Sequence, residues 1–193
     1  MELQHVNVKI PVAGELSDSL WGGGGLINLF HQWIREGVLD ELLIDVADYR
    51  HVPAGPGVML IGHEADYGLD NAGGRYGLRY NRKAPLAGSN EDRFAQAFRS
   101  AAGACKLLET QFAGDGGLAF SRREFELFIN DRAMAPNTAE TWAACEPELS
   151  AFVARVLGHG EFSMERQGDS RARFGVTVMA ARPFELVAIP GRS

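Results

Sequence analysis

The sequence predicts an α+β protein with a mostly antiparallel sheet and helices packed on it. Short runs alternate apolar with polar residues, as half-buried strands do. Between them lie apolar stripes of helical spacing, and glycine and proline clusters separate the segments. The chain has 193 residues, of which 46% are hydrophobic, enough for one substantial core. Because no linker or low-complexity segment divides it, we expect a single domain over 1–193.

The N-terminal part, residues 1–75, is expected to contain a strand, a helix and two more strands. The first strand is indicated by alternating apolar residues, Val6, Val8, Ile10 and Val12. Pro11 suggests that this strand ends there or lies at a sheet edge. The later elements are a helix at 26–37, strands at 42–47 and 58–61, and a polar, glycine-rich loop at 62–74.

Residues 76–181 are expected to form a ferredoxin-like unit of order β-α-β-β-α-β. A capping box, Ser89 with Asp92, should begin its first helix, and Asn137 its second. Pro147 should kink or divide that second helix. The elements are a strand at 76–80, a helix at 89–112, strands at 118–120 and 125–129, a helix at 137–157, and strands around 162–164, 174–178 and 184–189.

A weak internal repeat supports the ferredoxin-like hypothesis. In two places a strand is followed by Asn, a basic residue and Ala-Pro before a helix, with Asn81 and Asn130 at the matching positions. In this fold the strands that precede the two asparagines are antiparallel neighbours. We therefore expect Asn81 and Asn130 at opposite edges of the sheet, where their role would be in turns and helix starts.

Charge and cysteine content limit the possible partners and compartment. Twenty-five acidic against nineteen basic side chains give a formal charge of −6, which argues against general nucleic-acid binding. No apolar run approaches the roughly 18 residues of a membrane-spanning helix. Cys105 and Cys145 lie in apolar surroundings without a CxxC motif, so we expect buried, reduced thiols. Without a visible secretory leader, a cytoplasmic location is expected. No cofactor is predicted.

One candidate catalytic group follows the predicted strand at 58–61. His63, Glu64 and Asp66 supply the residue types that acid/base chemistry requires, at a point where a rigid strand enters a loop. If strands 42–47 and 58–61 pair antiparallel, Asp40 and Glu41 would join this group. Because there is no HExxH motif and no second histidine at ligand spacing, no metal site is predicted. The alternative is a polar loop with a hydrogen-bonded histidine.

Basic residues define a second candidate, a binding site for a small anionic ligand. The residues proposed for it are Arg82, Lys83, Arg122 and Arg123. Arg171 and Arg173 could extend the patch at the Arg122–Arg123 turn; the alternative is solvated loop charge. The glycines at 22–25 could present amide groups to a phosphate. They lack the Lys and Ser or Thr of a P-loop, so a flexible surface loop is the simpler interpretation.

Three functions remain open from the sequence. A non-enzymatic protein that binds a small ligand or assembles with itself, for example as a homodimer, is favoured because no catalytic motif is present and because sheet edges invite pairing. An acid/base or metal-assisted hydrolytic enzyme would use His63 with the nearby carboxylates. An adaptor would dock a protein or anionic partner through Arg122 and Arg123.

Overall fold

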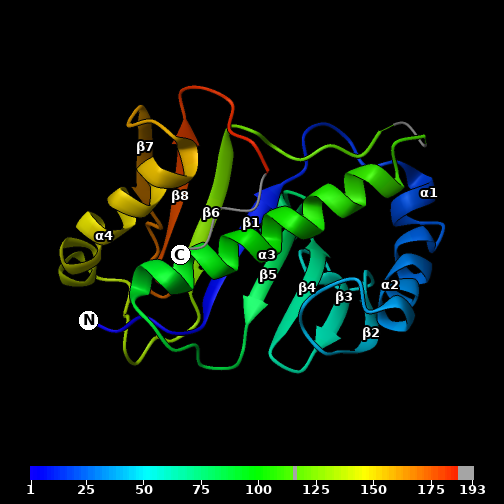
Figure 1. Cartoon of the computed structure of the whole chain (residues 1–193), viewed down its shortest axis with the longest axis horizontal. Helices are drawn as coiled ribbons and strands as arrows, with labels where there is room; N and C mark the ends of the chain where they lie inside the picture. The colour runs from blue at the N-terminus through cyan, green and yellow to red at the C-terminus, as the bar shows by residue number, and fades with distance from the viewer. Residues whose placement is uncertain (115–116, 187–193) are drawn as a thin grey trace.

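The computed structural model describes residues 1–114 and 117–186 and confirms the α+β class (Figure 1). Eight strands form one antiparallel sheet in the order β2-β3-β4-β5-β1-β6-β8-β7. The strands are β1 (Val6–Pro11), β2 (Leu43–Tyr49), β3 (Gly57–Gly62), β4 (Ala65–Asp70), β5 (Gly77–Arg82), β6 (Glu124–Ile129), β7 (Phe162–Arg166) and β8 (Gly175–Ala180).

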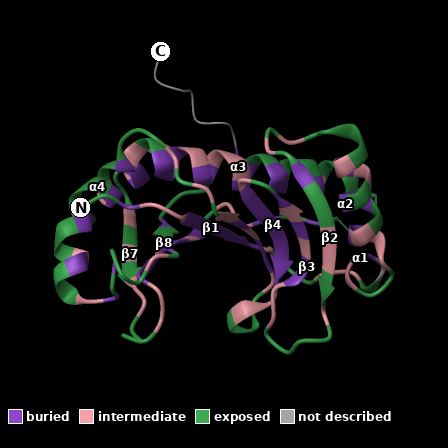
Figure 2. Cartoon of the chain, turned by 90° about the horizontal axis from the view of Figure 1, so that it is seen from below, coloured by how far each residue is buried: buried purple, intermediate pink, exposed green. Residues whose placement is uncertain are grey.

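The α-helices lie on one side of the sheet, and the other side is the arched underside seen in Figure 2. The long helix α3 crosses β1 and β5 in the middle of the sheet, α2 packs on β2, and α4 packs beside α3. The helices are α1 (Asp18–Trp21), α2 (Gly25–Glu36), α3 (Asn90–Gln111) and α4 (Ala139–Leu157), with a short 3₁₀ turn, η1 (Ala72–Gly74). The capping box of Ser89 and Asp92 at the start of α3 is confirmed.

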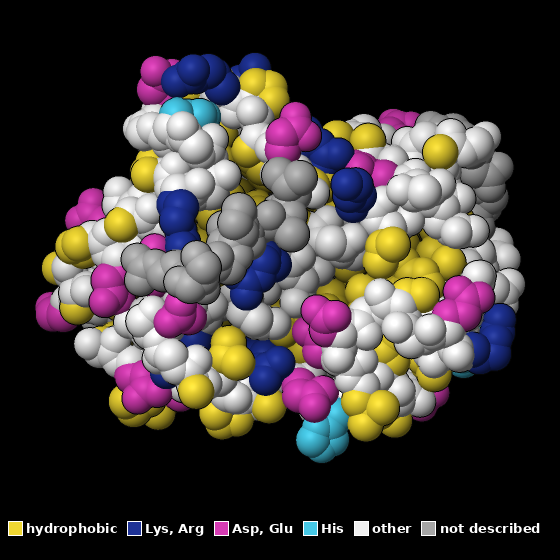
Figure 3. All heavy atoms as spheres, in the orientation of Figure 1, with side chains coloured by type: hydrophobic (Ala, Val, Ile, Leu, Met, Phe, Trp, Pro, Cys, Tyr) yellow, Lys and Arg dark blue, Asp and Glu magenta, His cyan; other side chains and the backbone are white. Residues whose placement is uncertain are grey.

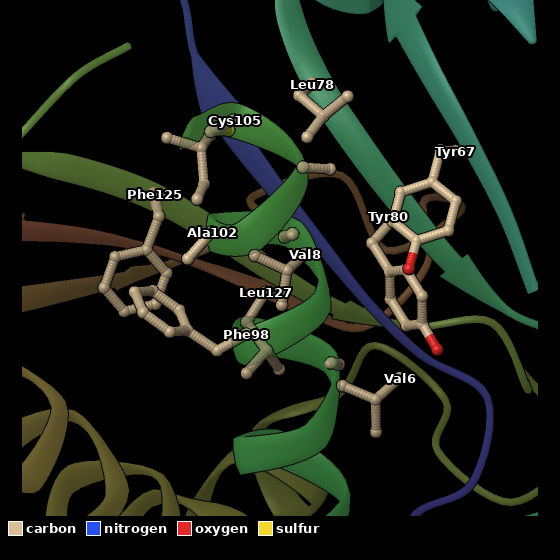
Figure 4. Close-up of a cluster of buried hydrophobic side chains, with 14 of the residues drawn as sticks. Val6, Val8, Tyr67, Leu78, Tyr80, Phe98, Ala102, Cys105, Phe125 and Leu127 are labelled. Atoms are coloured by element: carbon tan, nitrogen blue, oxygen red, sulfur yellow. The ribbon is translucent and has the colours of Figure 1, made fainter. Parts of the chain in front are cut away.

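The hydrophobic core fills the space between the sheet and the helices. Val6, Val8 and Ile10 point from β1 toward α3, as their alternation predicts, and are fully or almost fully buried. Phe98 of α3 packs edge-on against Phe125 of β6, with ring centroids 5.0 Å apart (Figure 4). Burying one such side chain stabilises the fold by about 1.5–3 kcal/mol. Both cysteines are free and buried, as predicted.

Several local predictions are corrected. Residues 65–70, which we expected to lie in a loop, form β4, whereas residues 118–120 form no strand beyond a bridge from Phe120 to Val12. Pro147 does not divide helix α4, which is capped by Thr138 rather than Asn137. Residues 184–186 are not in a strand, and the rest of the predicted strand at 184–189 lies outside the described residues.

The ferredoxin-like arrangement is not confirmed, because β1 lies between β5 and β6. The N-terminal strand pairs antiparallel with both, so the predicted parts 1–75 and 76–181 share one sheet. Two strands antiparallel to the same neighbour run parallel to each other. The ends of β5 and β6 therefore meet at the same edge, and Asn81 and Asn130 line one hollow rather than lying at opposite edges.

Candidate functional site

The face of the sheet away from the α-helices carries buried polar side chains. They come from alternate positions on β1, β4, β5 and β6, because successive residues of a strand point to opposite faces. Four of them, Asn7, Lys9, Asp66 and Asp70, are more than nine-tenths buried. Polar groups removed from water are costly unless they find partners, so such a cluster must be tied together or serve a ligand.

Lys9, Asp70 and Arg79 form the ionic centre of this face. The Nζ atom of Lys9 lies 2.6 Å from Oδ1 of Asp70 and donates to the backbone oxygens of Ala72 and Arg75. The Nη1 atom of Arg79 lies 3.0 Å from the other carboxylate oxygen of Asp70. Lys9 and Arg79 are directly paired across β1 and β5, where two like charges would destabilise the sheet. The carboxylate of Asp70 compensates both.

Two arginines lie over one aromatic ring beside this centre. The guanidinium carbon of Arg79 is 4.6 Å from the ring centroid of Phe128, and that of Arg173 is 4.9 Å from it. Phe128 lies on β6 opposite Gly175 of β8. A side chain at position 175 would crowd it, because an added Cβ would come within 2.7 Å of the Cβ of Phe128. Stacking on an aromatic face orients a guanidinium group and leaves its N–H edge open to hydrogen-bond acceptors.

The electrostatic environment of Arg173 is unfavourable for its own charge. Burial lowers the pKa of its guanidinium, and the nearby charges of Arg79 and Arg132 lower it further, with Asp70 acting in the opposite direction. Its polar contact is a long hydrogen bond of 3.4 Å from Nη1 to Oδ1 of Asn130. Three arginine charges therefore lie near one another, and the carboxylate of Asp70 pairs with that of Arg79.

Two hollows flank the stacked arginines. One of about 130 Å³ is lined by Asn7, Asn81 and Asn130, and one of about 260 Å³ by Glu126, Phe128 and other residues; Arg79 and Arg173 line both. Among the described residues that line the smaller hollow, Oδ1 of Asn7, Oδ2 of Asp70 and Nε of Arg79 are buried and have no hydrogen-bond partner, although Arg79 lies within ion-pair distance of Asp70. Two acceptors and one donor are thus available to a bound molecule or to water.

The predicted catalytic residues are only partly brought together. His63 and Glu64 form the turn between β3 and β4, with His63 Nδ1 3.3 Å from Glu64 Oε1 and the His63 side chain 69% exposed. Asp66 lies on the open face, where Lys83 pairs with it at 2.7 Å. Glu64 instead lines a separate pocket beside α3, together with Glu41 and Asp40, and His63 does not line that pocket. The described residues contain no group of three or more potential metal ligands.

The four basic residues predicted to bind an anion do not form one patch. Arg82 and Lys83 lie at the end of β5, and Arg122 and Arg123 lie just before β6. Because β5 and β6 run parallel, these pairs are at opposite ends of the sheet. Each of the four already has a protein partner: the Ala84 oxygen for Arg82, Asp66 for Lys83, Glu109 for Arg122 and the Ala181 oxygen for Arg123.

Sequence reasoning missed the central residues of the open face, Lys9, Asp70 and Phe128. A signal for part of it was present, since Ala65, Tyr67 and Leu69 alternate with polar residues and glycine as a half-buried strand does. Comparison with known protein families, curated proteins and solved structures finds no match. None of the helices in the described residues combines the length and the hydropathy that a transmembrane span requires.

Proposed function

We propose that the protein binds a small molecule carrying a carboxylate or phosphate group on the open face of its sheet. The observation that carries this proposal is Arg173, which is half-buried over Phe128. No carboxylate of residues 1–114 or 117–186 lies within ion-pair distance of it. An anion bound to its free N–H edge would supply the missing charge.

The neighbouring charges favour an anion over a cation at this position. Asp70 is neutralised by Lys9 and Arg79, and Asp66 by Lys83, so neither carboxylate is left with free negative charge. Glu126 lines only the larger of the two hollows, and burial raises the pKa of its carboxyl. The smaller hollow is therefore locally positive through Arg173, although the whole chain carries a formal charge of −6.

The size of the site limits the ligand. Pockets for drug-sized molecules usually have about 300–1,000 Å³. The two hollows beside Arg79 and Arg173 measure about 130 and 260 Å³. They fit an inorganic phosphate, a small phosphate ester or a short dicarboxylate better than a nucleotide.

Isothermal titration calorimetry with inorganic phosphate and with succinate, at constant ionic strength, tests the proposal. The variant Arg173→Gln removes the charge but keeps a planar polar side chain, and we expect it to bind at least about tenfold more weakly, as loss of a charge-assisted contact does. The matched control is Arg171→Gln, because the Arg171 side chain is 90% exposed. The proposal is wrong if neither ligand binds the parent protein, or if both variants bind like it.

A further inference from the structure

A second pocket, beside α3, is separate from the open face. It has a volume of about 740 Å³ and lies between α3, the loop before β2 and the ends of β4 and β5. Val38, Leu39 and Leu107 give it apolar walls, and acidic and basic side chains surround them. Figure 3 looks onto this side of the molecule and shows hydrophobic atoms exposed among charged side chains on its right-hand half.

The carboxylate of Glu41 is held on one side of this pocket by hydroxyl groups. Tyr67 donates to its Oε2 atom at 2.7 Å, and Tyr80 and Ser100 donate to its Oε1 atom at 3.2 and 3.4 Å. Gln96 fixes the network by donating to the hydroxyls of Tyr80 and Ser100. The two tyrosine rings are buried and lie side by side, with their hydroxyls toward the same side (Figure 4).

This carboxylate has three hydroxyl partners but no cationic one. No Lys, Arg or His nitrogen in the described residues lies within 4.0 Å of it. Burial raises the pKa of Tyr80 to about 12, so its hydroxyl remains a donor at neutral pH. A carboxylate offers about four acceptor positions. The network therefore leaves room for one more donor from the pocket side, and an ammonium group would also supply the missing charge.

Three basic residues also line this pocket. Arg82 is at the end of β5 and Arg99 directly precedes Ser100 on α3, whereas Lys106 is six residues beyond Ser100, a rise of about 9 Å along a helix. Between them lies Gly103, where an added Cβ would meet nothing within 4 Å. The part of the α3 wall between Ser100 and Lys106 is thus open at Gly103, which we call the floor of the pocket.

We propose that this pocket binds a small zwitterion, with a primary ammonium group at Glu41 and an anionic group near Lys106. A short aliphatic chain between the two groups would lie over Gly103 and against Leu107. A lone amine would meet the repulsion of the basic wall, and a lone acid that of Glu41, so both charges of the ligand contribute to recognition.

Three probes of equal chain length test this inference on the full chain. ε-Aminocaproate carries both charges, hexylamine only the ammonium group and caproate only the carboxylate. Titration calorimetry should detect ε-aminocaproate, with each single-charge probe binding at least about tenfold more weakly. Absence of ε-aminocaproate binding at tens of millimolar, or equal binding of hexylamine, overturns the proposal.

Two variants locate the binding and one serves as control. Glu41→Gln removes the charge and should abolish binding of ε-aminocaproate. Gly103→Leu fills the floor of the pocket without a backbone clash and should abolish it too, which keeps the test valid if the Glu41 variant folds poorly. Glu140→Gln, at an exposed site on α4, should bind like the parent protein. Unchanged binding by a folded Glu41→Gln or Gly103→Leu variant contradicts the assigned site.

Discussion

Replacing Lys9 with methionine tests the buried ionic centre of the open face. Lys9 is 1% exposed, its Nζ atom lies 2.6 Å from Asp70, and it makes two hydrogen bonds to backbone oxygens near η1. Methionine keeps most of the aliphatic stem that packs over Gly77 but leaves Asp70 with Arg79 as its remaining cation. Breaking a buried pair by removing one partner costs about 3–5 kcal/mol.

The expected loss is a large part of the total stability. Domains of this size unfold with about 5–15 kcal/mol, so Lys9→Met should lower the urea midpoint clearly. The double variant Lys9→Met with Asp70→Asn should be more stable than Lys9→Met alone. In the single variant the buried carboxylate of Asp70 keeps only Arg79 of its two cationic partners, whereas the double variant has no carboxylate there. The coupling energy should be about 1–3 kcal/mol.

Equilibrium urea unfolding followed by circular dichroism measures all four members of this cycle. Equal slopes for the four proteins would show that the change lies in stability rather than in the compactness of the unfolded state. If Lys9→Met lowers the unfolding free energy by less than about 1 kcal/mol, or the double variant is the least stable, then Lys9 does not compensate Asp70 as described.

Three further predictions follow. Gly77→Ala should destabilise the protein by about 1–3 kcal/mol in thermal unfolding, because its Cβ would lie 2.7 Å from Cε of Lys9 and 2.9 Å from the backbone oxygen of Ile10; a neutral effect would mean that both the Lys9 side chain and this part of β1 can shift. Burial raises the pKa of Tyr80 from the ordinary value of 10.0 to about 12 in the folded chain. The unfolded chain therefore loses this proton at a lower pH than the folded chain, and the unfolding free energy should fall as the pH rises from 10.0 toward 12. An unfolding free energy that does not change across this range would contradict the burial of the Tyr80 hydroxyl. Cys105 and Cys145, both with pKa values raised by burial, should react with Ellman's reagent only after unfolding, and rapid reaction of the native protein would place a thiol at the surface.

The elements with one clear periodicity were predictable from the sequence. Strand β1 shows the period of two that a single buried face requires, and α3 has both an apolar stripe and the capping box at Ser89. Strand β4 was missed because Gly68 and two acidic residues occupy its outward positions, a composition that usually indicates a loop. It is a strand because those positions face the buried charges of neighbouring strands.

The candidate site was less predictable, because it depends on pairing between distant segments. Lys9 and Arg79 become neighbours only when β1 is inserted beside β5, some seventy residues away in sequence. Local patterns carry no information about that insertion, which also reverses the expected separation of Asn81 and Asn130. Basic residues near turns, such as Arg122 and Arg123, were easier to notice, yet each has a protein partner.

The most direct measurement is nuclear magnetic resonance of the arginine side chains during a titration with inorganic phosphate. The Nε–Hε signals of Arg79 and Arg173, whose guanidinium groups both lie over Phe128, should shift together and saturate with one affinity. The signal of exposed Arg171 should shift little. Shifts confined to exposed arginines, or none at Arg79 and Arg173, would show that the open face of the sheet is not an anion site.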